Sequence, residues 1–285
     1  MINRREFVTG LAAAGLTSKL YAGDHGTKFN AGLELYSLRA DMKRDIPGTL
    51  ARVRQMGFDH VEVPGLYGLT ALEFRRALDN AGLKATAMVA EYGALRDNLS
   101  SVQRDLDVLG ARWALLGWIP HDKIFERSDA ERSAKDMNTW APSLVSSGYK
   151  FAYHPHGYEF HPSPEGTLFD LMASSTDPDT VKFELDAFWV VWPGQDCVQL
   201  MKRYPTRFKL LHLKDLRRGV KTGDLSGLAP EIDSVVIGEG VVPWNDVLVV
   251  AHEQQFEDYF IEDESPDAAQ QIPRSVHYLR EKSFI

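Results

Sequence analysis

The segment KATAMVAEYGALRDNLSSVQRDLDVLGARWALLGWI (residues 84–119) contains one complete repeat of the pattern that decides the fold. It begins with a short apolar run typical of a buried strand (84–90), and it then continues with apolar residues at helical spacing. Gly110 closes the helical stretch in the position of a helix C-terminus. A second apolar run (112–119) follows, so the segment predicts a strand, a helix and another strand in succession.

The same unit recurs along the rest of the chain. We predict eight strands, at residues 32–38, 60–65, 84–90, 112–119, 150–156, 181–189, 208–215 and 258–264. Gly57, Gly82 and Gly148 close other helical stretches as Gly110 does. Eight βα units in about 260 residues are typical of an α/β protein built as a single (β/α)8 TIM barrel. A doubly wound open sheet is the weaker alternative, because no glycine-rich phosphate-binding fingerprint follows the first strand.

The first 22 residues have a different character from the rest. Arg4 and Arg5 precede a short apolar run (7–16), and residues 3–7 closely match the core of a twin-arginine export signal. We therefore expect residues 1–22 to be a signal peptide, residues 23–285 to form the barrel, and the protein to be periplasmic. An amphipathic first helix is the alternative, because residues 20–22 match a cleavage site only in part. The apolar run is too short for stable membrane insertion.

The composition restricts the classes of partner. The formal net charge is −8 and no lysine- or arginine-rich face is visible, which argues against a nucleic-acid partner. Cys197 is the single cysteine, so no intramolecular disulfide can form. A small neutral or polar molecule is the expected ligand. The oligomeric state stays open, a homo-oligomer included.

Residues able to bind a metal or move a proton gather where the later predicted strands end. In a barrel of this type the active site is assembled from the C-terminal ends of the strands. The candidates are His154, His156, Glu159, Glu184, Asp186, His212, Lys214, Glu262 and Glu264. Such a mixed set of nitrogen and oxygen donors suits Mn²⁺, Co²⁺, Zn²⁺ or Fe²⁺ better than Ca²⁺. The sequence therefore predicts one divalent metal ion at the mouth of the barrel.

Six segments in this order and spacing carry a family resemblance: GLELYSLR (32–39), YHPHGYEF (153–160), FELDAFWVVWPGQD (183–196), LLHLKD (210–215), IGEGVVPW (237–244) and YFIEDE (259–264). Together they resemble the xylose isomerase-like barrel superfamily, in the branch of the sugar phosphate isomerases/epimerases. Inosose dehydratases and ketose 3-epimerases are relatives in this superfamily. The resemblance covers nearly all of the chain after the expected signal.

The resemblance also implies a set of metal ligands. Relatives use a carboxylate after the fifth strand, an Asp after the sixth, a His after the seventh and a Glu after the eighth, which implies Asp186, His212 and Glu262 here. The fifth-strand position departs from the pattern, because His154 stands where the epimerases have Glu. We expect Glu159 to be the missing carboxylate ligand, with His154 or His156 as the alternative.

The implied chemistry is removal of a proton next to a sugar carbonyl through a metal-stabilised enediolate. His154, His156, Glu262 and Lys214 are the expected catalytic residues, and Tyr36, Arg39, Glu62, Trp118 and Trp189 are the expected substrate contacts. The expected function is that of a sugar isomerase, epimerase or lyase acting on a non-phosphorylated sugar or a 3-keto-glycoside. A metal-dependent hydrolase of the same superfamily and a non-catalytic sugar-binding barrel are the alternatives.

Overall fold

Eight parallel strands close into a barrel in the computed structural model, which describes residues 29–285. The strands are β1 (Ala31–Glu34), β2 (His60–Val63), β3 (Lys84–Val89), β4 (Trp113–Leu116), β5 (Lys150–Tyr153), β8 (Val181–Asp186), β9 (Phe208–Leu213) and β12 (Asp258–Ile261). They pair around the barrel in the order β1-β12-β9-β8-β5-β4-β3-β2. This arrangement confirms the predicted (β/α)8 TIM barrel. The expected signal at residues 1–22 lies outside the described residues.

All eight predicted strands are present, but every one ends earlier than its apolar run. The run at 181–189 shows the reason. β8 ends at Asp186, whose side chain accepts a 2.9 Å hydrogen bond from the backbone N–H of Trp189 and so caps the short helix α8 (Ala187–Val191). The apolar residues of α8 are buried, so hydrophobicity alone does not mark the strand end. The first strand likewise passes into the 3-10 helix η1 (Leu35–Leu38).

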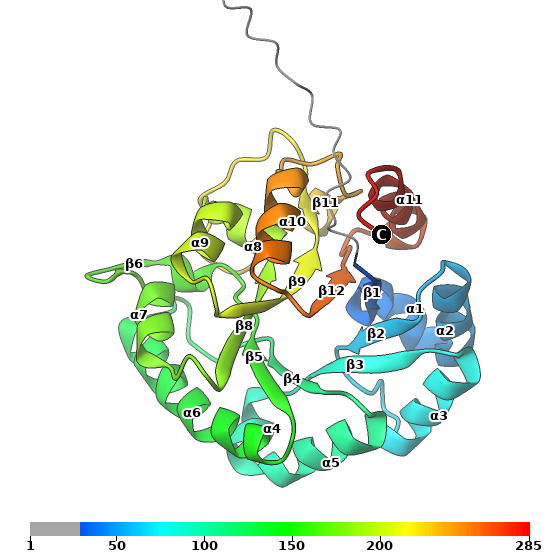
Figure 1. Cartoon of the computed structure of the whole chain (residues 1–285), viewed down its shortest axis with the longest axis horizontal. Coiled ribbons are helices and arrows are strands. Elements are labelled where there is room, and N and C mark those ends of the chain that lie inside the picture. The colour runs from blue at the N-terminus through cyan, green and yellow to red at the C-terminus, as the bar shows by residue number, and fades with distance from the viewer. Residues whose placement is uncertain (1–28) are drawn as a thin grey trace, which may run out of the picture.

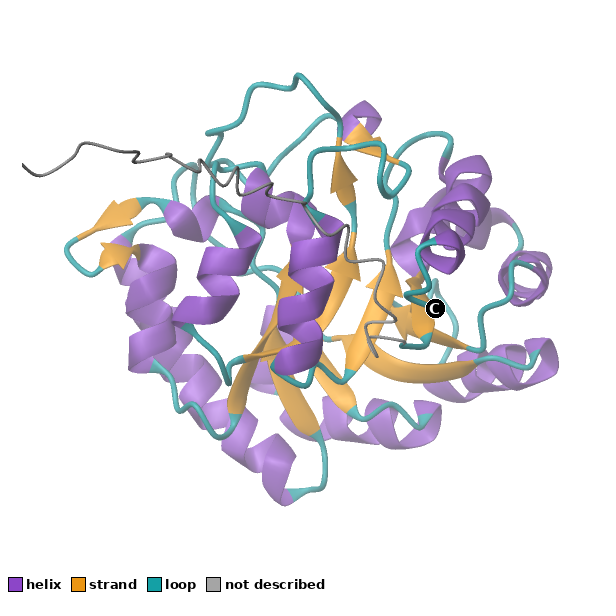
Figure 2. Ribbon diagram, turned by 45° about the horizontal axis from the view of Figure 1, so that its top comes forward, coloured by secondary structure: helices purple, strands orange, loops and turns teal. Residues whose placement is uncertain are grey.

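Helices surround the strands, as Figures 1 and 2 show. They are α1 (Arg39–Arg44), α2 (Ile46–Gln55), α3 (Ala71–Ala81), α4 (Tyr92–Asp97), α5 (Leu99–Leu109), α6 (Arg127–Ser146), α7 (Leu168–Ser175), α9 (Cys197–Arg203), α10 (Trp244–Glu253) and α11 (Ala268–Glu281). Gly82 and Gly110 cap α3 and α5 with φ of 71° and 73°, as the sequence predicts. Glycine takes up this left-handed conformation without the steric cost that a Cβ brings.

Apolar side chains fill the lower part of the barrel. The inner cluster consists of Ala87, Trp113, Leu115, Ala152, Leu210 and Phe260. Gly32 leaves room for it, because a Cβ at this position would lie 2.7 Å from ring atoms of both His60 and Phe260. The interior is therefore a packed core, and the polar side chains occupy the layer at the C-terminal ends of the strands.

The segment 217–240 follows the seventh barrel strand, β9, and the short strand β10 (Asp215–Leu216). It contains the 3-10 helix η3 (Glu231–Asp233) and the two-residue strand β11 (Ser234–Val235), which pairs with β10. A second short hairpin, β6 (Pro162–Ser163) with β7 (Gly166–Thr167), follows the 3-10 helix η2 (Tyr158–Phe160). Both hairpins are separate two-stranded sheets outside the barrel sheet.

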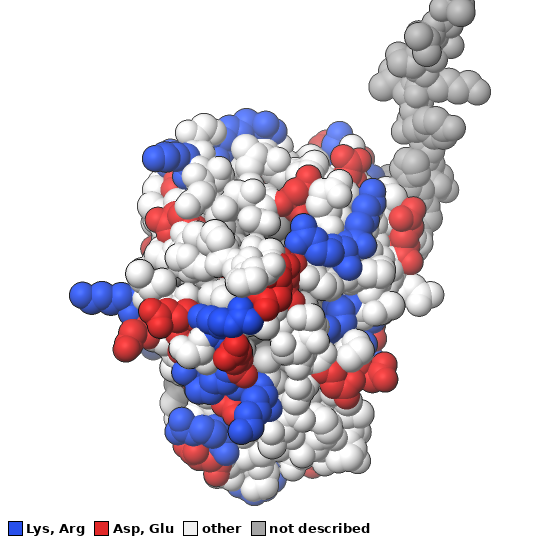
Figure 3. Space-filling model, turned by 90° about the vertical axis from the view of Figure 1, so that its left-hand side faces the viewer, with Lys and Arg blue, Asp and Glu red and all other residues white. Residues whose placement is uncertain are grey.

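Two further properties concern the surface. Across residues 29–285, no helix is both long and apolar enough to cross a membrane. On the side of the barrel where α7 and α9 lie, acidic and basic side chains are interspersed (Figure 3). This face therefore carries no broad area of positive charge.

Candidate metal centre and active site

A cavity of about 360 Å³ opens at the C-terminal ends of the barrel strands. Every strand contributes to it, at its end or directly after it, through Glu34, Glu62, Val89, Leu115, His154, Glu184, His212 and Glu262. The loop residues Gly227, Leu228 and Ala229 also line it. The volume is within the range of small-molecule sites, and the location is the one where barrels of this type place their active sites.

Strand register brings three of the expected metal ligands together. Asp186 on β8 is paired in register with His212 on β9, so their side chains point to the same side of the sheet. His212 Nδ1 lies 3.6 Å from Asp186 Oδ2 and 2.8 Å from Glu262 Oε2. All three residues are buried, and one ligand atom from each lies within 4.8 Å of the others. The structure therefore groups Asp186, His212 and Glu262 as the sequence predicts.

The donor set fits a divalent metal ion. Metal–ligand distances of about 2.0–2.2 Å place two ligands of one ion about 3 to 3.5 Å apart, close to the separations of these atoms. Asp186 Oδ2 is buried and has no hydrogen-bond partner, although it faces His212 Nδ1 at 3.6 Å and His154 Nε2 at 3.8 Å. A buried carboxylate oxygen that accepts no hydrogen bond from the described residues is costly, and a bound cation would satisfy it.

His154 supplies the fifth-strand position of this group. Its ring centroid lies 4.7 Å from that of His212, and its Nδ1 bonds to Glu184 Oε2 at 2.9 Å. Its other ring nitrogen, Nε2, is the atom that faces Asp186. With its Nδ1 proton directed to Glu184, His154 has a lone pair on Nε2, which faces the same Asp186 oxygen as His212 Nδ1 does.

The structure does not bring Glu159 into this group, which corrects our preferred ligand at the fifth strand. Its buried carboxylate accepts hydrogen bonds from the Tyr153 hydroxyl and from the backbone N–H groups of His156 and Gly157, the latter two at 3.2 and 2.8 Å. Gly157, with φ of 101°, turns the chain so that Glu159 folds back on its own strand end. Burial raises the pKa of Glu159 to about 7. His154, the alternative, is the residue that reaches the other ligands.

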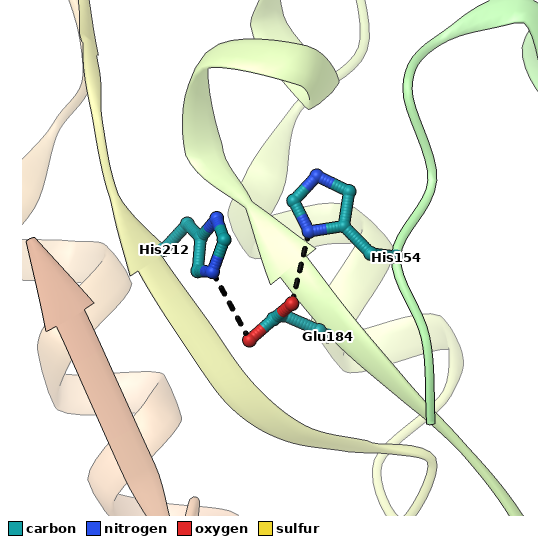
Figure 4. Close-up of side chains that lie close together, drawn as sticks. All are labelled: His154, Glu184 and His212. Carbon is teal, nitrogen blue, oxygen red and sulfur yellow. Dashed lines mark hydrogen bonds and ion pairs between the residues drawn. The ribbon is translucent and has the colours of Figure 1, made fainter. Parts of the chain in front are cut away.

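Glu184 forms a second group with the two histidines. Its carboxylate lies between their rings, 2.9 Å from His154 Nδ1 and 3.3 Å from His212 Nε2 (Figure 4). The same nitrogen of His212 bonds to Glu62 Oε1 at 3.2 Å. Each imidazole is thus held by carboxylates on the side opposite to Asp186.

The carboxyl groups near β1 and β2 have unusual acidities. Burial and the neighbouring Glu62 raise the pKa of Glu34 well above its ordinary value. Burial and Glu184 raise the pKa of Glu62 to about 8, although His212 opposes the shift. Burial also acts on Glu184, but the charge of His212 and the hydrogen bond from His154 outweigh it and lower that pKa to about 2. Near neutral pH Glu62 therefore keeps its proton, whereas Glu184 is ionised.

Lys214 contacts the carboxylates on the other side of the candidate metal centre. Its Nζ lies 3.4 Å from Glu262 Oε1 and 3.8 Å from Asp186 Oδ2, and it also pairs with Glu264. Burial acts against the charge of Glu262, but Lys214 and His212 outweigh it and lower the pKa of Glu262 well below its ordinary value. Lys214 is only 1% exposed and does not line the cavity. It contacts carboxylates that line the cavity, and its expected role as a direct donor to substrate stays a prediction.

Aromatic residues form the opposite wall. The His156 ring lies 5.5 Å from that of Trp118 and 5.4 Å from that of Trp189, and all three residues line the cavity. Burial and the neighbouring His154 lower the pKa of His156 well below its ordinary value, so this imidazole is neutral near pH 7. Its Nδ1 is buried and has no hydrogen-bond partner. His156 is thus able to accept a proton or a hydrogen bond from a ligand.

The two substrate contacts expected at the first strand, Tyr36 and Arg39, differ in their position relative to the cavity. Tyr36 lines the cavity and is 43% exposed. Arg39 does not line it, because its guanidinium pairs with Glu231 of the 217–240 segment and bonds to the carbonyl oxygen of Glu264 at 3.2 Å. The guanidinium carbon of Arg39 lies over the face of the Tyr36 ring, 4.6 Å from its centre, and so supports that ring.

Three glutamates of the cavity had no specific role among our expectations: Glu184 and Glu264 were candidates only as groups at strand ends, and Glu34 was not a candidate. Alternation along the strands places Glu184 two residues before Asp186 and Glu264 two after Glu262, on the same faces as those residues. Glu34 is paired in register with Glu62, a relation that only the structure reveals.

Comparison with known proteins agrees with this geometry. A family model described as Xylose isomerase-like TIM barrel matches residues 50–282. The chain belongs to this family. Among curated members, inosose dehydratase 2 of Bacillus cereus (strain ZK / E33L) is 25% identical over 169 residues, which cover 57% of the chain and 55% of that enzyme. The chain thus spans little more than half the length of the curated relatives it matches.

Solved structures of the Xylose isomerase-like TIM barrel type share the fold. A sugar phosphate isomerase/epimerase from Parabacteroides distasonis ATCC 8503 has a TM-score of 0.75 at 22% identity, covering 90% of this chain and 99% of that one. The IolI protein, solved with a bound zinc atom, has a TM-score of 0.66 at 14% identity, covering 90% of this chain and 96% of that one. These solved structures therefore show that the barrel fold is shared.

Proposed function

We propose that this protein is a divalent-metal-dependent carbohydrate enzyme that removes a proton from the carbon next to a carbonyl, as an isomerase, epimerase or lyase. The observation that carries the proposal is the buried, unpartnered Asp186 Oδ2, which faces ring nitrogens of His154 and His212. His154, Asp186, His212 and Glu262 would hold the ion. When bound, such an ion supplies polarisation of the carbonyl and stabilisation of the negative charge that develops on its oxygen.

Side chains of the protein would accept and return the proton. His156 lies in the cavity wall as a neutral imidazole and would accept the proton from carbon; its lowered pKa makes it a weak base that would return the proton readily. Glu262 stays ionised because Lys214 pairs with it, and it is the second group placed to exchange a proton with the ligand. Loss of a neighbouring substituent after proton removal would make the reaction that of a lyase, whereas return of the proton would give an isomer or epimer.

The lining of the cavity favours an uncharged sugar. Of its described residues, Glu34, Glu62, Glu184, Glu262 and Glu264 are acidic, and none is lysine or arginine. Carboxylates accept hydrogen bonds from sugar hydroxyls but repel a phosphate group. We therefore include a non-phosphorylated sugar or a 3-keto-glycoside as the substrate. Trp118 and Trp189 would pack against the apolar face of such a ring.

The location forms a further part of the proposal. The twin-arginine-like residues 3–7 would direct the folded protein to the periplasm, where non-phosphorylated sugars are the more available substrates. Export of a folded chain would also allow the metal to be loaded beforehand. Subcellular fractionation of cells producing the full chain, and of cells producing an Arg4→Lys, Arg5→Lys variant, tests this part separately.

Proton exchange tests the proposed chemistry directly. The Mn²⁺-loaded protein is incubated in D₂O with free sugars, 3-keto-glucosides and one sugar phosphate, and the recovered sugars are examined by NMR. We expect deuterium next to the carbonyl in at least one uncharged sugar, and none with the Asp186→Asn variant. Absence of exchange from every compound, with metal bound, would favour a hydrolase or a sugar-binding barrel instead.

A further inference from the structure

Glu184 faces both His154 and His212 of the proposed metal centre, on the side of the rings away from Asp186. Its Oε2 lies 2.9 Å from His154 Nδ1, and its Oε1 lies 3.3 Å from His212 Nε2. Figure 4 shows the two rings approaching this carboxylate from opposite sides. β8, which carries Glu184, lies between β5 and β9 in the barrel, so one side chain is able to reach both neighbours.

This arrangement determines which ring nitrogens remain free. A metal ion binds the neutral form of an imidazole, and in that form the ring has one N–H donor and one nitrogen lone pair. When N–H faces Glu184 from His154 Nδ1 and from His212 Nε2, the lone pairs are on His154 Nε2 and His212 Nδ1. Those two atoms are the ones that face Asp186 Oδ2, at 3.8 and 3.6 Å. Both nitrogens therefore face the same oxygen of Asp186, and His212 Nδ1 also lies 2.8 Å from Glu262 Oε2, another expected ligand.

We propose that Glu184 is a positioning residue that fixes the tautomers of His154 and His212, so that both rings present a lone pair to one divalent ion beside Asp186. This inference rests on the proposed metal centre. A carboxylate that accepts the second N–H of a metal-bound histidine orients the ring and increases its basicity. Glu184 accepts such a hydrogen bond from His154 at 2.9 Å. At His212, Glu62 forms the hydrogen bond to Nε2 at 3.2 Å, and Glu184 Oε1 adds an ion-pair contact to the same nitrogen at 3.3 Å.

The position of Glu184 in the strand supports this role over that of a ligand. Glu184 and Asp186 are two residues apart on β8, so both side chains face the barrel interior, with Glu184 one layer deeper. It is 0% exposed. Its two oxygens face one ring nitrogen each, on the sides of the rings away from Asp186. A metal ion at Glu184 would instead need the lone pairs on His154 Nδ1 and His212 Nε2, which reverses both tautomers.

The test reads the tautomers and the metal affinity, and it needs no substrate. Long-range ¹H–¹⁵N spectra of the Zn²⁺-loaded, ¹⁵N-labelled protein show which nitrogen of each ring carries the proton. We expect Nδ1–H with metal on Nε2 for His154, and Nε2–H with metal on Nδ1 for His212. The reverse assignment in the wild-type protein would overturn the inference, and this measurement does not depend on any variant folding.

Variants test the connection between the carboxylate and the rings. Glu184→Gln is expected to bind one Zn²⁺ per chain with an affinity reduced about 10- to 100-fold and to perturb the ring signals of both histidines. Glu62→Gln is expected to perturb His212 alone. Glu34→Gln is the matched control, because this buried glutamate accepts the backbone N–H of Tyr36 instead.

Four outcomes separate the possibilities. Complete loss of stoichiometric binding in a folded Glu184→Gln protein, equal to the loss in Asp186→Asn, would make Glu184 a ligand and contradict a positioning role. Unchanged affinity and unchanged ring signals would contradict it as well. Failure of the wild-type protein to bind any divalent ion would refute the metal centre and the inference together, whereas normal binding with reversed tautomers would refute the inference alone.

Discussion

Asp215 provides a quantitative test of how the structure holds the cavity together. Its buried carboxylate accepts four hydrogen bonds: from the backbone N–H groups of Gly238, Gly240 and Val242 at 2.9, 3.1 and 3.1 Å, and from Trp244 Nε1 at 2.9 Å. These donors fix the end of the 217–240 segment, and Gly227, Leu228 and Ala229 of the same segment line the cavity. Replacing Asp215 therefore acts on stability and on ligand binding.

The expected cost follows from the four donors. A hydrogen bond to a charged group contributes about 1.5–3 kcal/mol, but the four are not additive and the buried carboxylate itself is costly to desolvate. We therefore expect Asp215→Ala to lower the free energy of unfolding by about 4 kcal/mol, equivalent to a Tm decrease of about 8–16 °C for a domain of this size. Asp215→Asn keeps one oxygen acceptor and is expected to cost about half as much.

Thermal and urea-induced unfolding measure these differences. Asp196→Ala is the matched control, because that carboxylate caps α9 through a single N–H, from Gln199 at 3.0 Å, and its loss is expected to cost about 1 kcal/mol. Metal affinity should be retained in folded Asp215→Asn, since the ligands are on barrel strands, while KM should rise. An Asp215→Ala protein no less stable than Asp196→Ala would refute this account of the segment.

The remaining predictions concern the metal, the pH dependence and the substrate wall. Asp186→Asn is expected to reduce metal affinity by more than about 100-fold, beyond the usual effect of an outer-shell change, as titration calorimetry would measure; retained affinity would contradict its assignment as a ligand. The pKa of Glu159 is about 7 in the folded protein against an ordinary 4.5. The folded state therefore binds this proton more tightly than the unfolded state, and the resulting stabilisation is complete below pH 4.5 and is lost as the pH rises through 7. Relative to Glu159→Gln, the wild-type protein should therefore lose about 3 kcal/mol between pH 4.5 and 8 in urea denaturation, and a constant difference would contradict the shift. Trp118→Ala, at a side chain that is 41% exposed, should raise KM about 2- to 12-fold with little change in Tm; a fall in kcat at unchanged KM would show that the ring does not bind substrate.

The sequence was sufficient to predict the architecture because the strands of a parallel barrel are buried on both faces and read as apolar runs. It was not sufficient to predict where the strands end. Residues such as Leu35 and Phe188 are buried after the strand has stopped, so hydrophobicity continues across the boundary. Only the backbone hydrogen bonds and the Asp186 cap mark the true ends.

Part of the candidate metal group could be predicted from where its residues stand in the sequence. Asp186, His212 and Glu262 are at the ends of their strands, and a closed barrel brings such positions together. Glu159 was expected beside them because it follows the end of the fifth strand closely in sequence. The turn at Gly157 instead directs its carboxylate back to its own strand end. The contacts of Glu184 join residues 30 positions before it and 28 after it, so they depend on the packing of three strands.

Metal stoichiometry is the measurement that tests the central claim most directly. The protein is stripped with a chelator and titrated with Zn²⁺ or Mn²⁺, and bound metal is counted after dialysis in the wild-type protein and in an Asp186→Asn, Glu262→Gln variant. The account predicts one ion per wild-type chain, and loss of that ion in a variant that remains folded. Absence of bound metal from the wild-type chain, or equal binding by both proteins, would contradict the metal centre at the mouth of the barrel.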